Sequence, residues 1–361
     1  REIDVSGRVL VPGFIDTHSH HAGGLLDAPT ALAAVSQGIT TIVGGNDGSH
    51  PFPLTEAFDT LTKLAPSVNV AYYAGHGTLR SRVMGKDFAR KATPAEVDSM
   101  AVLLKQELDA GALGLSTGLE YDPGIYADRS EVLALAKVAA AAGGRYISHI
   151  RSEDRWFWDA IDEIITIGRE AKLPVQISHI KLAMVPLWGQ ADSLIRLLDA
   201  ARASGVDVTA DIYPYPYWQS TITVLFPKRD FENRAEAEKI LKEIVTPEGL
   251  LLGEFKARPD YSGRTLGQVA RERKEPPAVT LMALIRESLA WEENNPGQSG
   301  ESIVATSMDE ADIVKLLAWE HTNVCSDGSE SGAHPRGFGA FPRVISRYVG
   351  DQRALSLEQA V

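Results

Sequence analysis

The sequence predicts an α/β protein built as a (β/α)8 TIM-type barrel, with an insertion between the seventh and eighth strands. Short apolar runs rich in β-branched residues recur along the chain, and most are followed by a stretch with helical periodicity. The length of 361 residues exceeds the roughly 250 of a typical barrel, which favours one large core with insertions over two equal domains.

The predicted strands each end in a polar or glycine-containing cluster, where a loop to the next helix begins. They lie at residues 9–16, 39–44, 68–75, 112–119, 145–150, 175–180, 206–212 and 323–326. Eight strands that alternate with helices close into a barrel more naturally than into an open sheet.

Helices are predicted between these strands at residues 94–110, 130–142, 157–171 and 191–203. In the first of them, apolar residues recur at i, i+3, i+4, i+7 and i+11 from Val97, so that one stripe can pack on the sheet. Polar residues precede the second helix and Gly143 follows it, as expected of helix ends.

The predicted domain organisation is one barrel over residues 9–361, with residues 214–302 inserted over the barrel mouth. About 110 residues separate the last two strands, too many for an unstructured loop in a compact domain. Residues 1–8 are assigned to the edge of a truncated small β-sandwich domain, of which remnants are expected at the termini. Because the chain begins without Met, a removed signal peptide stays an alternative.

Charge and composition argue against several classes of partner. A net charge of -12 and a pI near 5.3, without a basic stripe, argue against nucleic acid. No apolar run approaches the roughly 20 residues of a membrane span, so no membrane partner is expected. Cys325 is the single cysteine, which excludes an intrachain disulfide. A cytoplasmic location is expected, with export as the alternative, and the oligomeric state is left open.

Metal-ligating residue types stand at the predicted carboxyl ends of four strands, where a parallel barrel places its active site. The first strand ends in His18 and His20, whose period-two spacing points both imidazoles to one side. His149 and His179 end the fifth and sixth strands, and Asp327 follows the eighth. These residues predict a metal centre. Zinc suits imidazole and carboxylate ligands, although manganese, cobalt or iron would fit the same set.

Several phrases of the sequence carry a more specific signal. They are VPGFIDTHSH at 11–20, GLEYDPG at 118–124, HIRSE at 149–153, SHIK at 178–181, SDG at 326–328 and HPRG at 334–337. In combination they resemble the N-acyl-D-amino-acid deacylase (D-aminoacylase) family of the amidohydrolase superfamily. The resemblance runs from about residue 9 to residue 361, nearly the whole chain.

The resemblance implies a zinc centre with one or two ions per chain. His149 and His179 would hold one ion, while His18, His20 and Asp327 would hold the other.

A ligand shared by the two ions is also implied, and here the sequence departs from the family. The family commonly places a cysteine in an Asn-Cys-Gly turn after the second strand, whereas this chain has Asn46, Asp47 and Gly48 there. Glu120, at the end of the fourth strand, is therefore the expected bridging ligand. Asp47 is the alternative.

Two residues are expected to take part in catalysis. Asp327 is expected to act as general acid and base, taking a proton from water and passing it to the leaving amine. Tyr121 is expected to contact the substrate and stabilise the developing oxyanion, with simple packing in its turn as the alternative.

A substrate with a free carboxylate needs a cation in the site. Lys181 matches the lysine that faces this carboxylate in the family, and a solvent-facing lysine is the alternative. Arg336 resembles a second anchoring position, with a loop salt bridge as the alternative. Arg151 is also expected at the barrel mouth, and the alternative there is an ion pair with Glu153 or Asp122.

The expected reaction is zinc-dependent hydrolysis of N-acyl-D-amino acids, which releases a carboxylate and a free D-amino acid. One alternative is a metal-dependent dipeptidase acting on peptides with a D-configured carboxyl-terminal residue. Another is a non-catalytic barrel that binds a small molecule. The D configuration rests on the resemblance alone, and no preference for a side chain or acyl group is predicted.

Overall fold

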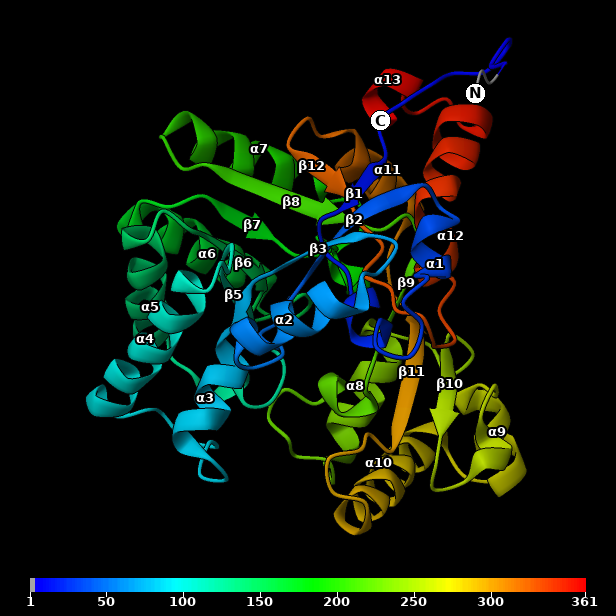
Figure 1. Ribbon diagram of the computed structural model, residues 1–361. Helices are drawn as coiled ribbons and strands as arrows, with labels where there is room; N and C mark the ends of the chain where they lie inside the picture. The colour runs from blue at the N-terminus through cyan, green and yellow to red at the C-terminus, as the bar shows by residue number, and fades with distance from the viewer. Residues whose placement is uncertain (1–3) are drawn as a thin grey trace.

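Parallel strands, most of them followed by a helix, make up most of the chain in the computed structural model, which describes residues 4–361 (Figure 1). The strands form two parallel sheets, with the orders β1-β2-β3 and β12-β8-β7-β6-β5-β4. Their bounds are β1 Phe14–Asp16, β2 Ile39–Gly44, β3 Asn69–Tyr72, β4 Ala74–Gly75, β5 Gly114–Gly118, β6 Arg145–His149, β7 Val175–Ile177, β8 Val208–Ile212 and β12 Thr322–Val324.

Hydrogen bonds join the two sheets at both edges. The Leu113 amide donates to the Tyr72 carbonyl at 2.9 Å, which links β3 to the start of β5. At the other edge, the Asp327 amide donates to the His18 carbonyl, also at 2.9 Å. These bonds bring the strands round into a ring, as the predicted barrel requires. The first strand is shorter than predicted, because residues 9–13 have no neighbouring strand and the Leu10 side chain is 86% exposed.

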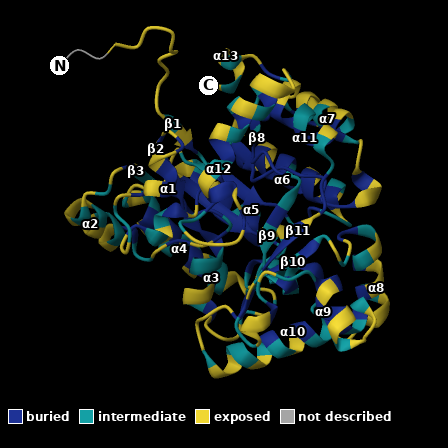
Figure 2. Ribbon diagram, turned by 90° about the vertical axis from the view of Figure 1, so that its right-hand side faces the viewer, coloured by how far each residue is buried: buried dark blue, intermediate teal, exposed yellow. Residues whose placement is uncertain are grey.

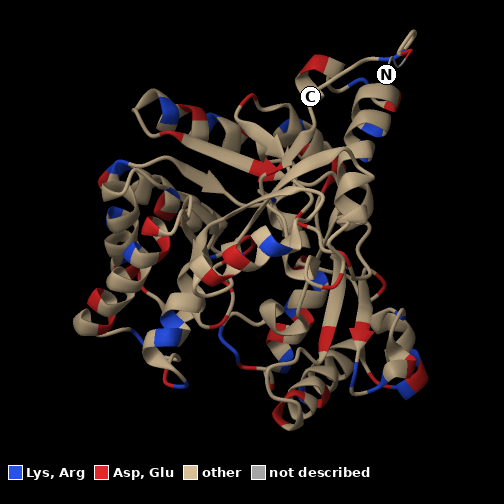
Figure 3. Cartoon of the chain, viewed as in Figure 1, with Lys and Arg blue, Asp and Glu red and all other residues tan. Residues whose placement is uncertain are grey.

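The four helices predicted from periodicity are found within one residue of their expected bounds, as α4 Pro94–Asp109, α5 Arg129–Ala141, α6 Phe157–Ala171 and α7 Ala191–Ala203. Thr93 and Glu96 form a capping box at the start of α4, and Asp128 caps α5. The central strands are buried, whereas the helices expose their outer faces (Figure 2). Charged residues of both signs are interspersed over these helices (Figure 3).

Further helices complete the ring: α1 Leu32–Val35, α2 Leu54–Leu64, α3 His76–Met84, α11 Glu310–Ala318, α12 Arg336–Arg343 and α13 Leu357–Ala360. Within residues 4–361, no helix combines the length and the hydrophobicity of a membrane span.

An antiparallel sheet lies in the sequence between β8 and β12 and forms a lobe below the parallel strands in Figure 1. Its strands are β9 Tyr217–Ser220, β10 Leu250–Phe255 and β11 Glu301–Thr306, in the order β10-β11-β9. Its helices are α8 Arg234–Glu243, α9 Leu266–Arg273 and α10 Pro277–Asn294. Because β11 continues to Thr306, the predicted boundary at residue 302 cuts through a strand, and the bounds 214–302 stay a prediction.

The assignment of residues 1–8 to a β-sandwich edge also stays a prediction. Residues 4–8 contain a turn and no strand, and residues 1–3 lie outside the described residues.

The loop after β2 packs its backbone directly against the ends of two other strands. A β-carbon on Gly75 would lie 2.4 Å from the Gly48 carbonyl oxygen, and one on Gly118 would lie 2.3 Å from the Asp47 carbonyl oxygen. Side chains at either glycine would therefore push the loop away. Glycine at these positions fixes where the Asp47 side chain lies.

We expect the Gly118→Ala substitution to destabilise the fold by about 1–3 kcal/mol, the usual cost of overpacking a tight site. Urea unfolding measures this change in the free energy of unfolding. Gly23→Ala is the matched control, because a β-carbon there would contact nothing within 4 Å. If both variants have the same free energy of unfolding, the loop after β2 can move to accept a side chain at Gly118 without loss of stability.

Candidate functional site

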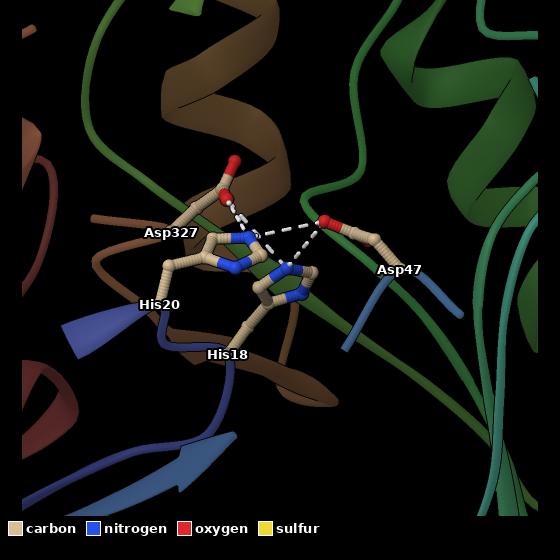
Figure 4. A group of neighbouring side chains, drawn as sticks. All are labelled: His18, His20, Asp47 and Asp327. Carbon is tan, nitrogen blue, oxygen red and sulfur yellow. Dashed lines mark hydrogen bonds and ion pairs between the residues drawn. The ribbon is translucent and has the colours of Figure 1, made fainter. Parts of the chain in front are cut away.

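The first of two neighbouring groups of side chains combines His18, His20, Asp47 and Asp327 (Figure 4). Asp47 Oδ2 lies 3.2 Å from His18 Nε2 and 3.1 Å from His20 Nε2. Asp327 Oδ1 lies 3.2 Å from His20 Nε2 and 3.6 Å from His18 Nε2. Both imidazoles after β1 therefore face the same two carboxylates, as the spacing of the histidines predicted.

The second group combines His149, His179 and, again, Asp47. His149 Nδ1 lies 3.0 Å from His179 Nε2, so the two imidazoles at the ends of adjacent strands face each other. Asp47 Oδ1 lies 3.4 Å from His179 Nε2. One carboxylate thus reaches the first group with one oxygen and the second group with the other.

Glu120 occupies a different position from the one expected of a shared ligand. Its Oε2 lies 3.0 Å from His149 Nε2, and its Oε1 accepts a hydrogen bond from the Glu153 amide at 2.9 Å. It belongs to a third group with His149 and Glu153, remote from the histidines that follow β1. The distances therefore place Asp47, rather than Glu120, between the two histidine pairs, because the loop after β2 folds over the strand ends.

The electrostatics of this cluster are dominated by buried charge. Burial alone would lower the pKa of His18, but the neighbouring Asp47 and Asp211 carboxylates outweigh burial and raise it well above its ordinary value. Burial alone would raise the pKa of Asp47, but His18 and His179 hold it well below its usual range. These carboxylates need positive charge beside them, from protonated imidazoles or from a cation.

The residues present fit a zinc centre. Imidazole nitrogens and carboxylate oxygens are the ligands that Zn²⁺ takes in proteins, and in each group these atoms lie within 4.8 Å of one another. Asp47 Oδ1 is buried and has no hydrogen-bond partner among residues 4–361, which leaves a lone pair available for a cation.

Three of the predicted substrate-binding residues line a cavity beside the cluster: Tyr121, Lys181 and Arg336. Lys181 Nζ lies 2.6 Å from Glu153 Oε1 and 2.7 Å from His179 Nδ1. Arg336 Nη1 lies 2.6 Å from Asp327 Oδ2. Both cations are thus buried and paired. Lys181 does not face open solvent, and Arg336 makes the salt bridge considered as its alternative, with Asp327 as the partner.

Tyr121 packs its ring against His149, with the ring centroids 4.4 Å apart. Burial raises the pKa of its phenol well above the ordinary value, and the nearby Asp47 carboxylate adds to this effect. The phenol therefore keeps its proton at neutral pH and remains a hydrogen-bond donor.

Arg151 requires a correction, because its side chain turns away from the cavity. Its Nε and Nη2 donate to the Glu163 carboxylate at 2.8 Å each, and its Nη1 donates to the Ala127 carbonyl. The partner is a residue of α6, which is neither of the two partners considered from the sequence. Arg151 ties α6 to the loop before α5, and it is not among the residues that line the cavity.

Sequence reasoning missed two buried acids of the site. Glu153 pairs with Lys181 and lies 2.9 Å from His179 Nδ1. Asp211, near the end of β8, accepts the His179 amide at 2.7 Å and lies 3.5 Å from His18 Nδ1. An acidic residue near the end of an apolar strand was the available signal for Asp211.

The inserted sheet supplies a wall of the cavity. Trp218, Gln219 and Ser220 of β9 face the barrel residues, and Val224, Leu225 and Ile244 follow them. Trp218 belongs to an aromatic cluster that could be expected in a pocket, whereas no local pattern marks the others, because they meet the site only through the packing of the lobe.

A parallel ring with clustered histidines and acids at its carboxyl ends is the arrangement of the amidohydrolases. The model of the amidohydrolase family matches residues 1–220 of this chain. The N-acyl-D-glutamate deacylase of Alcaligenes xylosoxydans xylosoxydans is 35% identical over 385 aligned residues, which cover 100% of this chain and 72% of the relative.

Two solved structures are similar over nearly the whole chain. The N-acyl-D-glutamate deacylase of Bordetella bronchiseptica, complexed with zinc and a phosphonate inhibitor, has a TM-score of 0.83 at 31% identity and covers 97% of this chain and 72% of its own. A D-aminoacylase structure that addresses the role of a binuclear metal centre also has a TM-score of 0.83 at 31% identity, with 99% and 74% coverage.

The chain is thus an enzyme of the amidohydrolase superfamily. Within that superfamily it belongs to the D-aminoacylase, or N-acyl-D-amino-acid deacylase, family.

We expect Arg151→Ala to lower the free energy of unfolding by about 1–3 kcal/mol, because the buried Glu163 carboxylate loses both hydrogen bonds that Arg151 donates. Hydrolysis of an N-acyl-D-amino acid should stay within twofold of the wild type. Urea unfolding and steady-state kinetics measure the two effects. Arg169→Ala, at an exposed position of α6, is the control and should change neither the stability nor the rate of hydrolysis. A selective rise in KM for Arg151→Ala would restore its predicted role in substrate binding.

Proposed function

We propose that the protein hydrolyses the amide bond of N-acyl-D-amino acids, releasing a carboxylate and a free D-amino acid. The observation that carries this proposal is the position of the cavity. Paired histidines and Asp327 stand on one side of it, and the buried cations Lys181 and Arg336 stand beside them. The family relationship supports the reaction and is the basis for the D configuration.

The zinc ligands we propose follow the two groups of side chains. His18, His20 and Asp327 would hold one ion, His149 and His179 would hold a second, and Asp47 would be shared. Glu120 contacts His149 and is not needed as a ligand in this arrangement. When bound, zinc polarises the amide carbonyl and lowers the pKa of water to about 7.

Asp327 is proposed as the group that accepts a proton at Oδ1 and passes it to the leaving amine nitrogen. Burial raises its pKa, but the Arg336 charge at Oδ2 outweighs burial and holds the pKa below its ordinary value, so Asp327 begins ionised. A substrate carboxylate that binds Arg336 would share this cation. The pKa of Asp327 would then rise, which makes the carboxylate a better proton acceptor once substrate is present.

Lys181 and Arg336 are proposed to bind the α-carboxylate, and Tyr121 to donate its phenol proton toward the carbonyl oxygen as negative charge develops. Lys181 is held by Glu153, which prevents rotation of the ammonium group and keeps it directed at the cavity. A fixed donor contributes more than a mobile one, because it needs no reorganisation during the reaction.

The far wall of the cavity favours a substrate with an uncharged, apolar side chain. Ala183, Trp218, Val224, Leu225 and Ile244 form this wall. Asp154 also lines the cavity, and its carboxylate is paired at 2.5 Å with Arg155, whose Nη2 donates to the Leu225 carbonyl at 3.5 Å. An acidic side chain would lose its hydration there, beside a cation that Asp154 and Glu236 already pair.

Replacement of the shared carboxylate tests the proposed ligands. We expect Asp47→Asn to weaken the binding of at least one zinc ion about tenfold or more. Loss of a residue that only hydrogen-bonds to a ligand already weakens metal binding about tenfold, and loss of a ligand should cost at least as much. Zinc per chain after dialysis measures the effect. Glu120→Gln is the matched control and should keep its zinc, because Glu120 contacts only His149 among the histidines. If Glu120→Gln loses zinc and Asp47→Asn keeps it, Glu120 is the bridging ligand.

A panel of N-acetyl amino acids, with added zinc, tests the substrate. We expect kcat/KM for N-acetyl-D-leucine to exceed that for N-acetyl-D-glutamate at least tenfold, since a buried unpaired charge costs more than the ~1.4 kcal/mol that tenfold represents. N-acetyl-L-leucine should be the poorest of the three. A preference for the D-glutamate substrate would contradict the apolar wall, and inactivity toward the whole panel would contradict the proposed function.

A further inference from the structure

A groove beside His20, between a short 3₁₀ helix at His21–Gly24 and the helix α2, has no role in the proposed reaction. Its volume of about 570 Å³ lies within the roughly 300–1,000 Å³ of sites that bind small molecules. Tyr72 and Ala22 form its floor over the backbone of Gly44. A β-carbon on Gly44 would lie 2.8 Å from Tyr72 Cε1 and 3.1 Å from Ala22 Cβ, so this floor is closely packed.

The lining of the groove is largely apolar and carries little charge. Its apolar side chains include Ala22, Leu26, Phe52, Pro53, Ala57 and Leu61. Within residues 4–361, Glu56 is the only Asp, Glu, Lys or Arg in this lining. Burial lowers the pKa of His50, which also lines the groove, to about 4, so that its imidazole is uncharged at neutral pH. The groove therefore suits an uncharged, apolar group of a ligand.

The groove is continuous with the proposed active site. It shares His20 and Ser49 with a wide cleft of about 1050 Å³, which Asp47 and Asp327 also line. His20 Nε2 lies 3.1 Å from Asp47 Oδ2 and 3.2 Å from Asp327 Oδ1. A flexible chain that leaves the cluster of histidines and acids past His20 therefore enters the groove.

The proposed binding mode directs the acyl group of the substrate toward this side. Lys181 and Arg336 would hold the α-carboxylate in the cavity that Trp218 also lines. In the described part of the chain, that cavity shares no lining residue with the groove, and the wide cleft connects the two. The cleft itself is lined mainly by polar residues, among them Asp122 and Glu254. An apolar acyl chain therefore finds its apolar partners in the groove.

We propose that the groove binds the alkyl chain of a long acyl group, so that the enzyme hydrolyses N-acyl-D-amino acids derived from medium-chain fatty acids such as octanoic acid. This inference rests on the proposed function, because it uses the same scissile amide and the same carboxylate anchor. Water adds to the acyl carbonyl and the C–N bond breaks. The fatty acid leaves as its carboxylate, and the nitrogen of the D-amino acid takes the proton.

Three leucine substrates separate the length of the acyl chain from its polarity. They are N-acetyl-D-leucine, N-octanoyl-D-leucine and N-(7-carboxyheptanoyl)-D-leucine, whose chain has the length of octanoyl but ends in a carboxylate. In the wild type with zinc, we expect kcat/KM for the octanoyl substrate to exceed that for the acetyl substrate about tenfold or more, since each buried methylene contributes roughly fourfold. The carboxyheptanoyl substrate should lose this gain, because its carboxylate would approach Glu56 without a cation from the described residues of the groove.

Leu26→Asp and Thr60→Asp place a charge on opposite walls of the groove, at positions exposed enough to leave the fold intact. Each should lower kcat/KM for the octanoyl substrate about fivefold or more and leave the acetyl substrate within about twofold. Leu32→Asp and Thr62→Asp are the matched controls. Leu32 is 69% exposed, against 63% for Leu26, and Thr62 is an exposed threonine of α2 like Thr60, but neither control residue lines the groove.

The proposal is overturned if the wild type hydrolyses the octanoyl substrate no better than the acetyl substrate, or if the control variants lower the octanoyl value as much as the groove variants do. It is also overturned if Leu26→Asp yields a smaller species in sedimentation velocity without a change in acyl preference, because the groove would then be a contact between copies of the chain. Failure of the wild type with zinc to hydrolyse either substrate would instead contradict the proposed function.

Discussion

The close backbone packing of Gly48, Gly75 and Gly118 is the constraint on which the arrangement of the site depends. It brings the loop after β2 over the ends of β4 and β5, where a β-carbon on Gly75 or Gly118 would meet loop backbone at 2.4 Å or less. Asp47 adopts a φ of 53° in this loop. Its carboxylate then faces the histidines of β1 on one side and His179 on the other. No other acid of the cluster reaches both groups.

Charge balance is the second requirement, since carboxylates and cations are buried together. Lys181 pairs with Glu153, and Arg336 pairs with Asp327, so each cation in the cavity is matched by an acid. The match offsets both cations and keeps the long side chains in place. In the proposed reaction, a bound carboxylate would redistribute these pairs instead of meeting two free cations, which would couple substrate binding to the basicity of Asp327.

The sequence predicted those features whose cause is local. Period-two spacing predicted that His18 and His20 face the same way, and both face Asp47 although they follow β1 instead of ending it. Helical periodicity located α6 and α7 to the residue. Long-range packing decided the rest. The two-residue spacing from His149 predicted that the Arg151 side chain faces the barrel mouth. Instead, it donates hydrogen bonds to Glu163 on α6. Asp47 was the second choice for the bridging ligand, because no local sequence feature predicts that Gly48, Gly75 and Gly118 pack against one another.

The ring and the lobe contribute different parts of the proposed site, which explains why the reaction was easier to infer than the substrate. The proposed ligand and proton-transfer residues lie at strand ends of the ring, where position follows from the fold. The wall proposed to meet the substrate comes from β9 and the segments that follow it, which are tied to the ring by a few polar contacts. Arg336 reaches the Gln219 carbonyl, and Arg229 donates to the Glu120 carbonyl at 3.0 Å and to Asp122 at 2.8 Å.

These contacts connect the lobe to the two segments of the ring that carry proposed catalytic groups, the turn at Glu120 and Tyr121 and the loop after β12. A shift of the lobe would therefore move Arg336 and Tyr121 together with the substrate wall. Changes of side chain on β9 can alter which acyl group or side chain fits, while the histidines and Asp327 remain anchored to the ring. Selectivity can thus vary in this architecture without disturbing the proposed ligands.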